Sequence, residues 1–150
     1  MQLKRAERRY KLTTQDYAQL AAFRRALREF LHFSEAAAAE AGVTAQHYQA
    51  MLIIRGCPED QCVTIRDLAQ QFFIRHHSAV GLVDRLVHEG LVTRTPSSDD
   101  RRKVELRLTT EGRRVLARLA KMHRRELQRI GPILRLFFAE LSRPQQGRRP

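Results

Sequence analysis

The chain has 150 residues, of which 43% are hydrophobic and 29% charged, and it carries a net charge of +12 with a sequence pI near 11.1. This composition is typical of a globular domain with its own core, and no apolar run approaches the roughly 18 residues of a membrane span. The basic amino terminus lacks the apolar segment of a secretory signal, so we expect a cytoplasmic protein. Such a basic excess favours a polyanionic partner, either nucleic acid or an anionic membrane surface.

Residues 1–13 are rich in Lys and Arg, and we expect either a frayed arm or an arm that contacts phosphates. A long amphipathic helix is predicted over 14–41, because Thr13 or Thr14 can cap its start and Gly42 can end it. Its apolar stripe consists of Leu20, Phe23, Leu27, Phe30 and Leu31. A helix of this length exceeds what a small core needs.

A second helix is predicted from its cap, Thr44, to about Arg55, with Gly56 and Pro58 at its end. Its candidate core residues are Tyr48, Met51, Leu52 and Ile54. The GCPEDQC segment that follows is predicted to be a loop, and Val63 can form a strand of one or two residues beyond it.

Two short helices are predicted next. Thr64 and Asp67 form a pattern close to a capping box, which marks a helix start, and Ile65, Leu68, Ala69 and Phe72 recur at helical spacing. A break at Phe73 and Ile74 leads to a helix over about 75–88. Helix, turn and helix in this order are typical of a DNA-reading unit.

The helix over 75–88 has two different faces. Its apolar face consists of Ala79, Val80, Val83, Leu86 and Val87. The opposite face consists of His77, Ser78, Gly81, Arg85 and His88. A small, polar and cationic face suits the floor of a DNA major groove, although taken alone it could equally be a solvated surface.

A hairpin is predicted after Gly90, which can end the helix. Residues 91–95 and 104–108 alternate with period two, as half-buried strands do, and the PSSDDRRK loop between them is polar. Its tip carries Arg101, Arg102 and Lys103, which can reach a phosphate backbone or a minor groove. The fold class is therefore mainly α (α+β), a winged helix-turn-helix within a single domain over 1–150.

The carboxy-terminal part is predicted to be helical. Thr109 can cap a long helix with the apolar stripe Val115, Leu116, Leu119, Met122, Leu127 and Ile130. Gly131 and Pro132 are expected to break it, leaving a last helix over 133–141 and a disordered tail over 142–150. The helices over 14–41 and 110–141 flank the DNA-reading region over 44–109 and indicate a dimerisation region built from both termini.

These segments together resemble the MarR (multiple antibiotic resistance regulator) family of bacterial transcription factors. The matching pieces are LAQQF at 68–72, SAVGLVDRL at 78–86, EGLVTR at 89–94, DDRRK at 99–103 and LRLTTEG at 106–112. Each piece is weak alone, but all five occur in the same order and spacing. The resemblance implies a homodimeric regulator, expected to be a repressor, that binds a pseudo-palindromic operator and is released by a small aromatic or anionic effector.

The resemblance also assigns roles in the hairpin over 91–108, which we call the wing. The first Arg of the D-R-R motif, here Arg101, would enter the minor groove, and the second, Arg102, would pair with an acid. The sequence departs from the family pattern at two positions. In the turn, where Gly is frequent, the chain has Phe73. At the cap of the helix over 75–88, which we call the reading helix, members often have Ser or Thr and this chain has Arg75. A bulky Phe argues against a left-handed turn residue, so we expect a different turn geometry.

From these arguments we expect a DNA interface built from the reading helix, the helix before it and the wing. Its candidate residues are Thr64, Arg66, Arg75, His76, His77, Ser78, Gly81, Arg85, Ser98, Asp100, Arg101, Arg102 and Lys103. Ser78 and Arg85 can bind base edges or phosphates, and Gly81 lets the backbone approach DNA. His76 lies toward the core side of the helical wheel, so a buried, hydrogen-bonded histidine is as consistent with the pattern as a DNA contact.

A candidate effector site consists of Phe30, His32, Phe33, His47 and Met51, although ordinary surface or core placement explains each of them alone. Cys57 and Cys62 lack the spacing of a CxxC motif and a nearby zinc-completing His, so we expect no metal and no cofactor. No Gly-rich phosphate loop or nucleophile elbow indicates an enzyme. The alternatives are a redox- or metal-responsive regulator that uses both cysteines, or an effector-independent basic nucleic-acid-binding protein.

Overall fold

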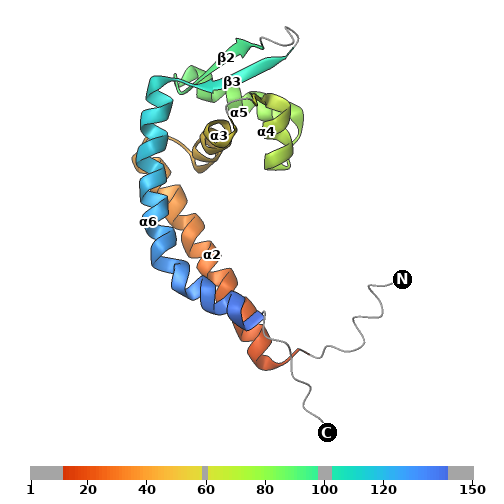
Figure 1. Cartoon of the computed structure of the whole chain (residues 1–150), viewed down its shortest axis with the longest axis vertical. Helices are drawn as coiled ribbons and strands as arrows, with labels where there is room; N and C mark the ends of the chain where they lie inside the picture. Colours follow the sequence, from red (N-terminus) through yellow and green to blue (C-terminus); the bar gives the residue numbers. More distant parts are fainter. Residues whose placement is uncertain (1–11, 59–60, 98–102, 142–150) are drawn as a thin grey trace, which may run out of the picture. The chain divides into compact units, whose positions relative to one another are not determined.

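The computed structural model of the chain describes residues 12–58, 61–97 and 103–141. The chain divides into two compact units, one formed by Met1–His32 with Arg125–Pro150 and the other by Phe33–Arg124. Two long helices, α2 (Thr14–Glu40) and α6 (Thr110–Leu141), contribute residues to both units (Figure 1). We describe each unit separately and call Phe33–Arg124 the central unit and the other the terminal unit.

The central unit holds three further helices and a small sheet. Its elements are α3 (Ala45–Gly56), β1 (Val63–Thr64), α4 (Ile65–Phe72), α5 (His76–His88), β2 (Val92–Pro96) and β3 (Val104–Leu108). The three strands are antiparallel in the order β1-β3-β2, with Val63 opposite Leu106 and Val92 opposite Leu108. The predicted hairpin and the short strand at Val63 are both confirmed, and the winged helix-turn-helix architecture with them.

Side-chain caps fix where α3, α4 and α6 begin. Thr44 accepts a hydrogen bond from the His47 amide at 3.1 Å. Thr64 and Asp67 form a complete capping box, in which the Asp67 carboxylate accepts from the Thr64 amide at 2.8 Å. The Thr109 hydroxyl accepts from the Gly112 amide at 2.9 Å. These caps satisfy amides that have no partner within their helices, and all three occur where the sequence predicts them.

The core of the central unit forms where these elements meet. Its largest fully buried side chains are Met51, Leu68, Val83, Leu86, Val92 and Leu119. Two predicted core positions are wrong, because Leu52 is 39% and Val87 37% exposed. Leu82 is buried instead, so the buried face of α5 includes Leu82 and excludes Val87.

The turn between α4 and α5 corrects a second expectation. Phe73 adopts the left-handed conformation with φ 53° and ψ 38°, the geometry that the sequence argument excluded for a bulky residue. Its amide donates to the Gln70 carbonyl at 3.2 Å, and the Ile74 amide donates to the Ala69 carbonyl at 3.0 Å. These bonds close the end of α4, so the short reversal between two packed helices overrides the intrinsic preference of Phe.

In the terminal unit, α2 and α6 lie against each other through aromatic side chains. Phe23 stacks on Phe137 with ring centroids 4.5 Å apart and meets Phe138 edge-on at 6.0 Å. Gln19 donates a hydrogen bond to Glu140. The Thr13 hydroxyl caps the start of α2 by accepting from the Asp16 amide at 3.3 Å, and Thr13 is one of the two caps that the sequence predicts. The Asp16 carboxylate in turn accepts from the Thr13 amide at 2.7 Å.

The predicted break at Gly131 and Pro132 is wrong, since α6 continues through both residues. A proline inside a helix removes only its own amide hydrogen bond, although its ring also crowds the preceding turn. Contacts on both sides hold the helix together, because Ile130 is 3% exposed and Phe137 stacks on Phe23. Among the described residues, no helix is long and apolar enough to cross a membrane.

Candidate nucleic-acid interface

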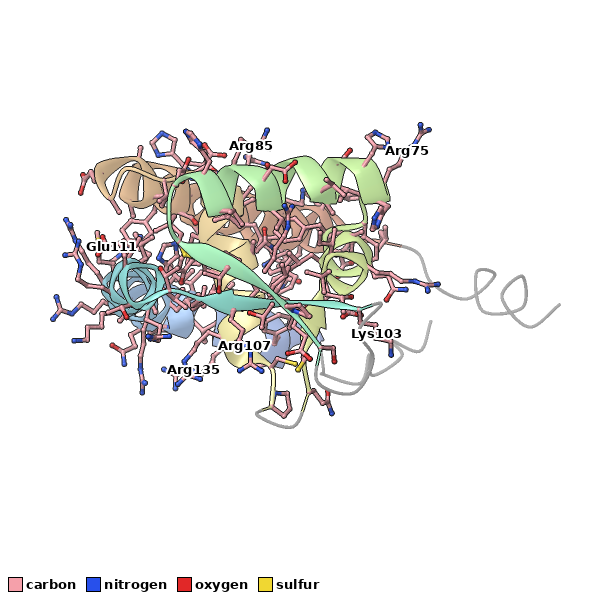
Figure 2. All side chains as sticks on the ribbon, turned by 90° about the horizontal axis from the view of Figure 1, so that it is seen from above. Arg75, Arg85, Lys103, Arg107, Glu111 and Arg135 are labelled. Carbon is pink, nitrogen blue, oxygen red and sulfur yellow. The ribbon has the colours of Figure 1, made fainter. Side chains whose placement is uncertain are left out.

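The outer face of α5 matches the face predicted to read DNA. Its polar and cationic side chains are exposed, namely those of His77, Ser78, Arg85 and His88. Figure 2 shows Arg75 and Arg85 directed away from the core, with Arg75 at the start of the helix. Gly81 on this face has no atom within 4 Å of the position that a Cβ would take, so the helix backbone is open to a partner there.

No acidic residue occurs between Asp67 and Asp84, a stretch that contains α4 after its first turn, the connecting turn and most of α5. The two flanking acids are both engaged. Asp67 belongs to the capping box of α4, and Asp84 accepts a hydrogen bond from Arg94 at 2.6 Å. The surface around α5 therefore presents cationic and neutral groups, which favours a polyanionic partner.

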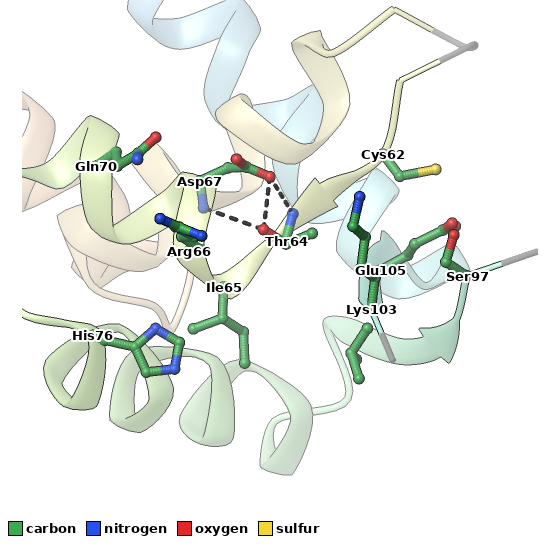
Figure 3. Close-up of a pocket in the computed structure, with 11 residues that line it drawn as sticks. Cys62, Thr64, Ile65, Arg66, Asp67, Gln70, His76, Ser97, Lys103 and Glu105 are labelled. Atoms are coloured by element: carbon green, nitrogen blue, oxygen red, sulfur yellow. Dashed lines mark hydrogen bonds between the residues drawn. The ribbon is translucent and has the colours of Figure 1, made fainter. Parts of the chain in front are cut away.

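An open groove of about 750 Å³ lies where the start of α4, the start of α5 and the base of the wing meet. In Figure 3, Arg66 and His76 are on one side of this groove, and Lys103, Glu105 and Ser97 are on the other. His76 is exposed, so the alternative of a buried, hydrogen-bonded histidine is wrong. The basic side chains of this groove are Arg66, His76 and Lys103, and each can donate hydrogen bonds to phosphate.

Glu105 is a buried carboxylate at the base of the wing, where its side chain is 5% exposed. Hydrogen bonds from Ser97 first, then from Cys62 and Arg107, lower its pKa to about 2. The Arg107 bond measures 3.0 Å. Cys62 directly precedes β1, Ser97 directly follows β2 and Arg107 lies in β3. The carboxylate therefore links all three strands through hydrogen bonds.

The structure brings some of the predicted interface residues together. Arg66, His76 and Lys103 share the groove, while Ser78, Gly81 and Arg85 share the outer face of α5. Thr64 also lines the groove, but its hydroxyl donates to Asp67 at 2.7 Å and is committed to the helix cap. Arg75 and His77 are exposed at the start of α5, and the other four predicted residues, Ser98, Asp100, Arg101 and Arg102, lie outside the described residues.

Sequence reasoning missed two ion pairs and one close contact that shape this surface. Arg94 joins the wing to α5 through Asp84, and Glu105 braces the strands. Gly112 lies against the chain before β2, where a Cβ would be 2.0 Å from the Leu91 carbonyl oxygen. The only sequence signal for Gly112 was its place in the LRLTTEG segment, since nothing local demands a glycine there.

The candidate effector residues fall in both units. Phe30 and His32 belong to the terminal unit, where His32 is exposed. Phe33, His47 and Met51 belong to the central unit, where Met51 is fully buried and His47 is 2% exposed. The His47 Nδ1 atom lies 3.1 Å from the Glu89 carboxylate at the end of α5, close enough for an ion pair but without hydrogen-bond geometry.

A second buried histidine, His123, was not anticipated. Its Nδ1 lies 2.8 Å from the Leu119 carbonyl and its Nε2 lies 2.8 Å from the Ser34 hydroxyl. A carbonyl can only accept, so Nδ1 carries the proton and the serine hydroxyl donates to Nε2 when the ring is neutral. Tyr48 stacks on the ring at 4.1 Å, and burial raises the pKa of this tyrosine.

Neither Cys57 nor Cys62 forms a disulfide; Cys57 is half-buried and Cys62 is exposed. The Cys62 thiol donates a hydrogen bond to Glu105 and so helps to hold the strands at the base of the wing. Within residues 12–58, 61–97 and 103–141, His, Cys, Asp and Glu form no group of three or more that could hold a metal ion.

Comparison with known proteins supports the same assignment. Residues 41–103 match the MarR family profile. The HTH-type transcriptional regulator FarR of Neisseria gonorrhoeae is 38% identical over 76 residues, which are 51% of this chain and 50% of that protein. The chain thus aligns with half the length of this curated relative.

Solved structures share the fold. A MepR variant of Staphylococcus aureus bound to an oligodeoxyribonucleotide has a TM-score of 0.63 at 18% identity, covering 88% of this chain and 95% of that chain. CouR of Rhodococcus jostii, bound to p-coumaroyl-CoA, has a TM-score of 0.64 at 24% identity, covering 79% and 85%. The profile match over residues 41–103, the relative and the shared fold point the same way: the chain is similar to winged helix-turn-helix proteins of the MarR family.

Proposed function

We propose that this protein is a DNA-binding transcriptional regulator. The observation that carries the proposal is the outer face of α5, where Ser78, Gly81 and Arg85 are presented. No acidic residue occurs from Leu68 to Val83, and the next acid, Asp84, is paired with Arg94. A rigid helix with small residues and donors along one face suits the major groove. The family's members are transcription regulators and not enzymes, which agrees with this reading.

Each part of the interface has a distinct role in this proposal. Ser78 and Arg85 bind base edges, and Gly81 allows the backbone of α5 to approach the groove floor. Arg66 and Lys103 contact phosphates on either side of the groove that they line, and these contacts set the orientation of the protein without reading sequence. Arg101 of the wing enters the adjacent minor groove.

The active form is proposed to be a homodimer that represses from a pseudo-palindromic operator. Apolar side chains of the terminal unit support this, because a monomer leaves them in water. Examples are Leu31 at 59%, Ile133 at 54%, Leu136 at 69% and Phe138 at 52% exposed. Burying such a surface against a second copy would give two reading helices related by a two-fold axis, as a pseudo-palindrome requires.

An aromatic or anionic small molecule is proposed as the effector, and the protein is proposed to act in the cytoplasm. CouR, a structural neighbour, is described as bound to p-coumaroyl-CoA, an aromatic and anionic ligand. The candidate contacts remain Phe30, His32, Phe33, His47 and Met51. His47 is the most informative of these, because its neighbour Glu89 ends the reading helix.

Selection of bound duplexes from a random DNA pool tests the proposal directly. We expect enrichment of a short motif with two-fold symmetry, bound at least about a thousandfold more tightly than scrambled DNA. Equal binding to all duplexes would support the effector-independent basic protein instead. Binding to the selected duplex that changes with oxidant or chelator would support a redox or metal sensor that uses Cys57 and Cys62.

A further inference from the structure

The turn between α4 and α5 requires a left-handed residue at position 73, but it does not require a phenylalanine there. The side chain of Phe73 is 96% exposed, the highest value among the large exposed hydrophobic residues that the structure describes. It is also the only non-glycine residue with a positive φ in that part of the chain. Both features cost free energy, one through apolar contact with water and the other through crowding of the Cβ atom. A glycine or asparagine in the same turn would avoid both costs.

The surroundings of Phe73 indicate what could meet its ring. The residue stands between α4 and α5, directly before Ile74, which is 36% exposed, and Arg75, which begins α5 without a side-chain cap. The next side chains, His76 and His77, are exposed as well. Phe73 therefore lies within the stretch that lacks acidic residues, next to a helix start that carries Arg75, His76 and His77.

We propose that Phe73 is a DNA-contacting residue whose ring packs on the apolar carbon surface of the duplex beside the amino-terminal end of α5. This inference rests on the DNA-binding function proposed above and adds a contact to it. Two groups of DNA offer such a surface, the C5-methyl group of thymine in the major groove and the carbons of deoxyribose. Strain held at an exposed position is expected where the strained residue serves a ligand and not the fold.

Substitution of Phe73 should affect stability and DNA affinity in different ways, because the exposed ring and the strained backbone cost stability while the ring is proposed to contribute to binding. Phe73→Asn accepts the left-handed conformation and removes the exposed ring, so the free protein should melt at the same temperature or slightly higher. The same change should weaken binding to the duplex selected by the wild-type protein by about tenfold, as expected when burial of roughly half an aromatic ring is lost. Phe73→Leu keeps a smaller apolar surface and should fall between the two.

A control variant separates this effect from a general loss of surface hydrophobicity. Leu52→Gln removes an apolar side chain that is 39% exposed on α3, and it should leave DNA affinity unchanged. A duplex with deoxyuridine in place of thymidine distinguishes the two DNA groups. Wild-type protein that binds this duplex more weakly, with Phe73→Asn insensitive to the change, identifies the methyl group; equal binding by the wild type identifies the sugar.

The outcomes that overturn the inference are distinct from failure of the proposed function. If the wild type binds its selected duplex and Phe73→Asn binds equally well, the ring has no role in DNA contact. A lower melting temperature for Phe73→Asn would show that the ring serves the fold, and a changed oligomeric state without a change in affinity would show that it meets protein. A wild type that selects no duplex at all would remove the proposed function and this inference with it.

Discussion

Asp84 on α5 and Arg94 on β2 form an ion pair with an N–O distance of 2.6 Å, which connects the reading helix to the wing. The pair is partly exposed, at 56% for Asp84 and 36% for Arg94, so it contributes at most about 1 kcal/mol to stability. Its position matters more than its strength. Asp84 is the first acid after the acid-free stretch, and Arg94 neutralises it beside the surface proposed to face DNA.

This relationship predicts an asymmetry between two single variants. Arg94→Gln leaves an unpaired carboxylate beside α5, which should weaken binding to every duplex by roughly threefold to tenfold through repulsion of phosphates. Asp84→Asn frees a cation and should leave binding unchanged or strengthen it. The double variant should return close to the wild type. Titrations of selected and scrambled duplexes at several salt concentrations measure this, and equal losses from both single variants would show that the pair acts only by holding the wing.

Glu105 predicts a dependence of stability on acid. Its pKa is held near 2, below the ordinary value of a glutamate, so its hydrogen bonds stabilise the fold above about pH 4.5, and this stabilisation is lost as pH falls towards 2. Glu105→Gln should therefore lower the melting temperature at pH 7, and the difference from the wild type should close between about pH 4.5 and pH 2. Glu111→Gln, at an exposed pair with Arg114, serves as the control and should change stability much less. A difference that widens in acid would contradict this account of Glu105.

Two glycines predict opposite effects of the same substitution. Gly112→Ala would place a Cβ 2.0 Å from a backbone oxygen of Leu91, so it should destabilise the protein by about 1–3 kcal/mol or more. Gly81→Ala meets no atom within 4 Å and lies inside α5, so it should stabilise the fold by about 0.5–1 kcal/mol. Chemical denaturation of both variants measures these changes.

The same Gly81→Ala variant also tests the docking of α5. A methyl group at the point where the backbone is proposed to approach DNA should weaken binding to the selected duplex, even though the free protein is more stable. Unchanged affinity in this more stable variant would show that α5 does not approach DNA through Gly81.

The exposed apolar residues of the terminal unit predict the assembly. Leu136→Lys replaces a side chain that is 69% exposed, so a monomeric protein should tolerate it without loss of stability. If two copies bury this residue, the variant should dissociate at concentrations where the wild type is dimeric, because an unpaired charge in an apolar interface is costly. Analytical ultracentrifugation of both proteins decides this, and an unchanged dimer would place the interface elsewhere.

Much of the fold follows from short-range signals in the sequence. The capping box of Thr64 and Asp67, the cap at Thr109 and the strand at Val63 all depend on residues within a few positions of each other, or on patterns that repeat along one element. The polar face of α5 could be predicted because a period of 3.6 residues separates it from the buried face.

The errors arose where distant contacts decide the outcome. Phe73 is left-handed because α4 and α5 must reverse direction over a short turn, and α6 passes Pro132 because Ile130 and Phe137 are held on either side of it. The burial of Glu105 depends on donors from three separate segments, which no local pattern reveals. The exposed polar face of α5 could therefore be predicted from the sequence, whereas the contacts of Glu105 and the Asp84–Arg94 ion pair could not.

Substitutions in the wing and in the reading helix are predicted to affect DNA binding differently. Arg101→Ala, in the loop between β2 and β3, should weaken binding to every sequence and reduce the salt slope by about one unit, because a contact in the minor groove is mainly electrostatic. Arg102→Ala should resemble it, because the resemblance implies that Arg102 pairs with an acid in the wing and the substitution would leave that acid unpaired. A collapse of sequence discrimination in Arg101→Ala would show that the wing reads bases.

The central claim is that the outer face of α5 reads base sequence, and its most direct test is the affinity of Arg85→Ala and Ser78→Ala for the selected duplex and for scrambled DNA. Loss of a base contact should cost roughly 1–3 kcal/mol on the selected duplex and little on scrambled DNA, so the ratio of the two affinities should narrow. Arg118→Ala removes the same charge from the polar side of α6 and should preserve that ratio. If Ser78→Ala and Arg85→Ala instead lower both affinities equally, α5 contacts only the DNA backbone and the account is wrong.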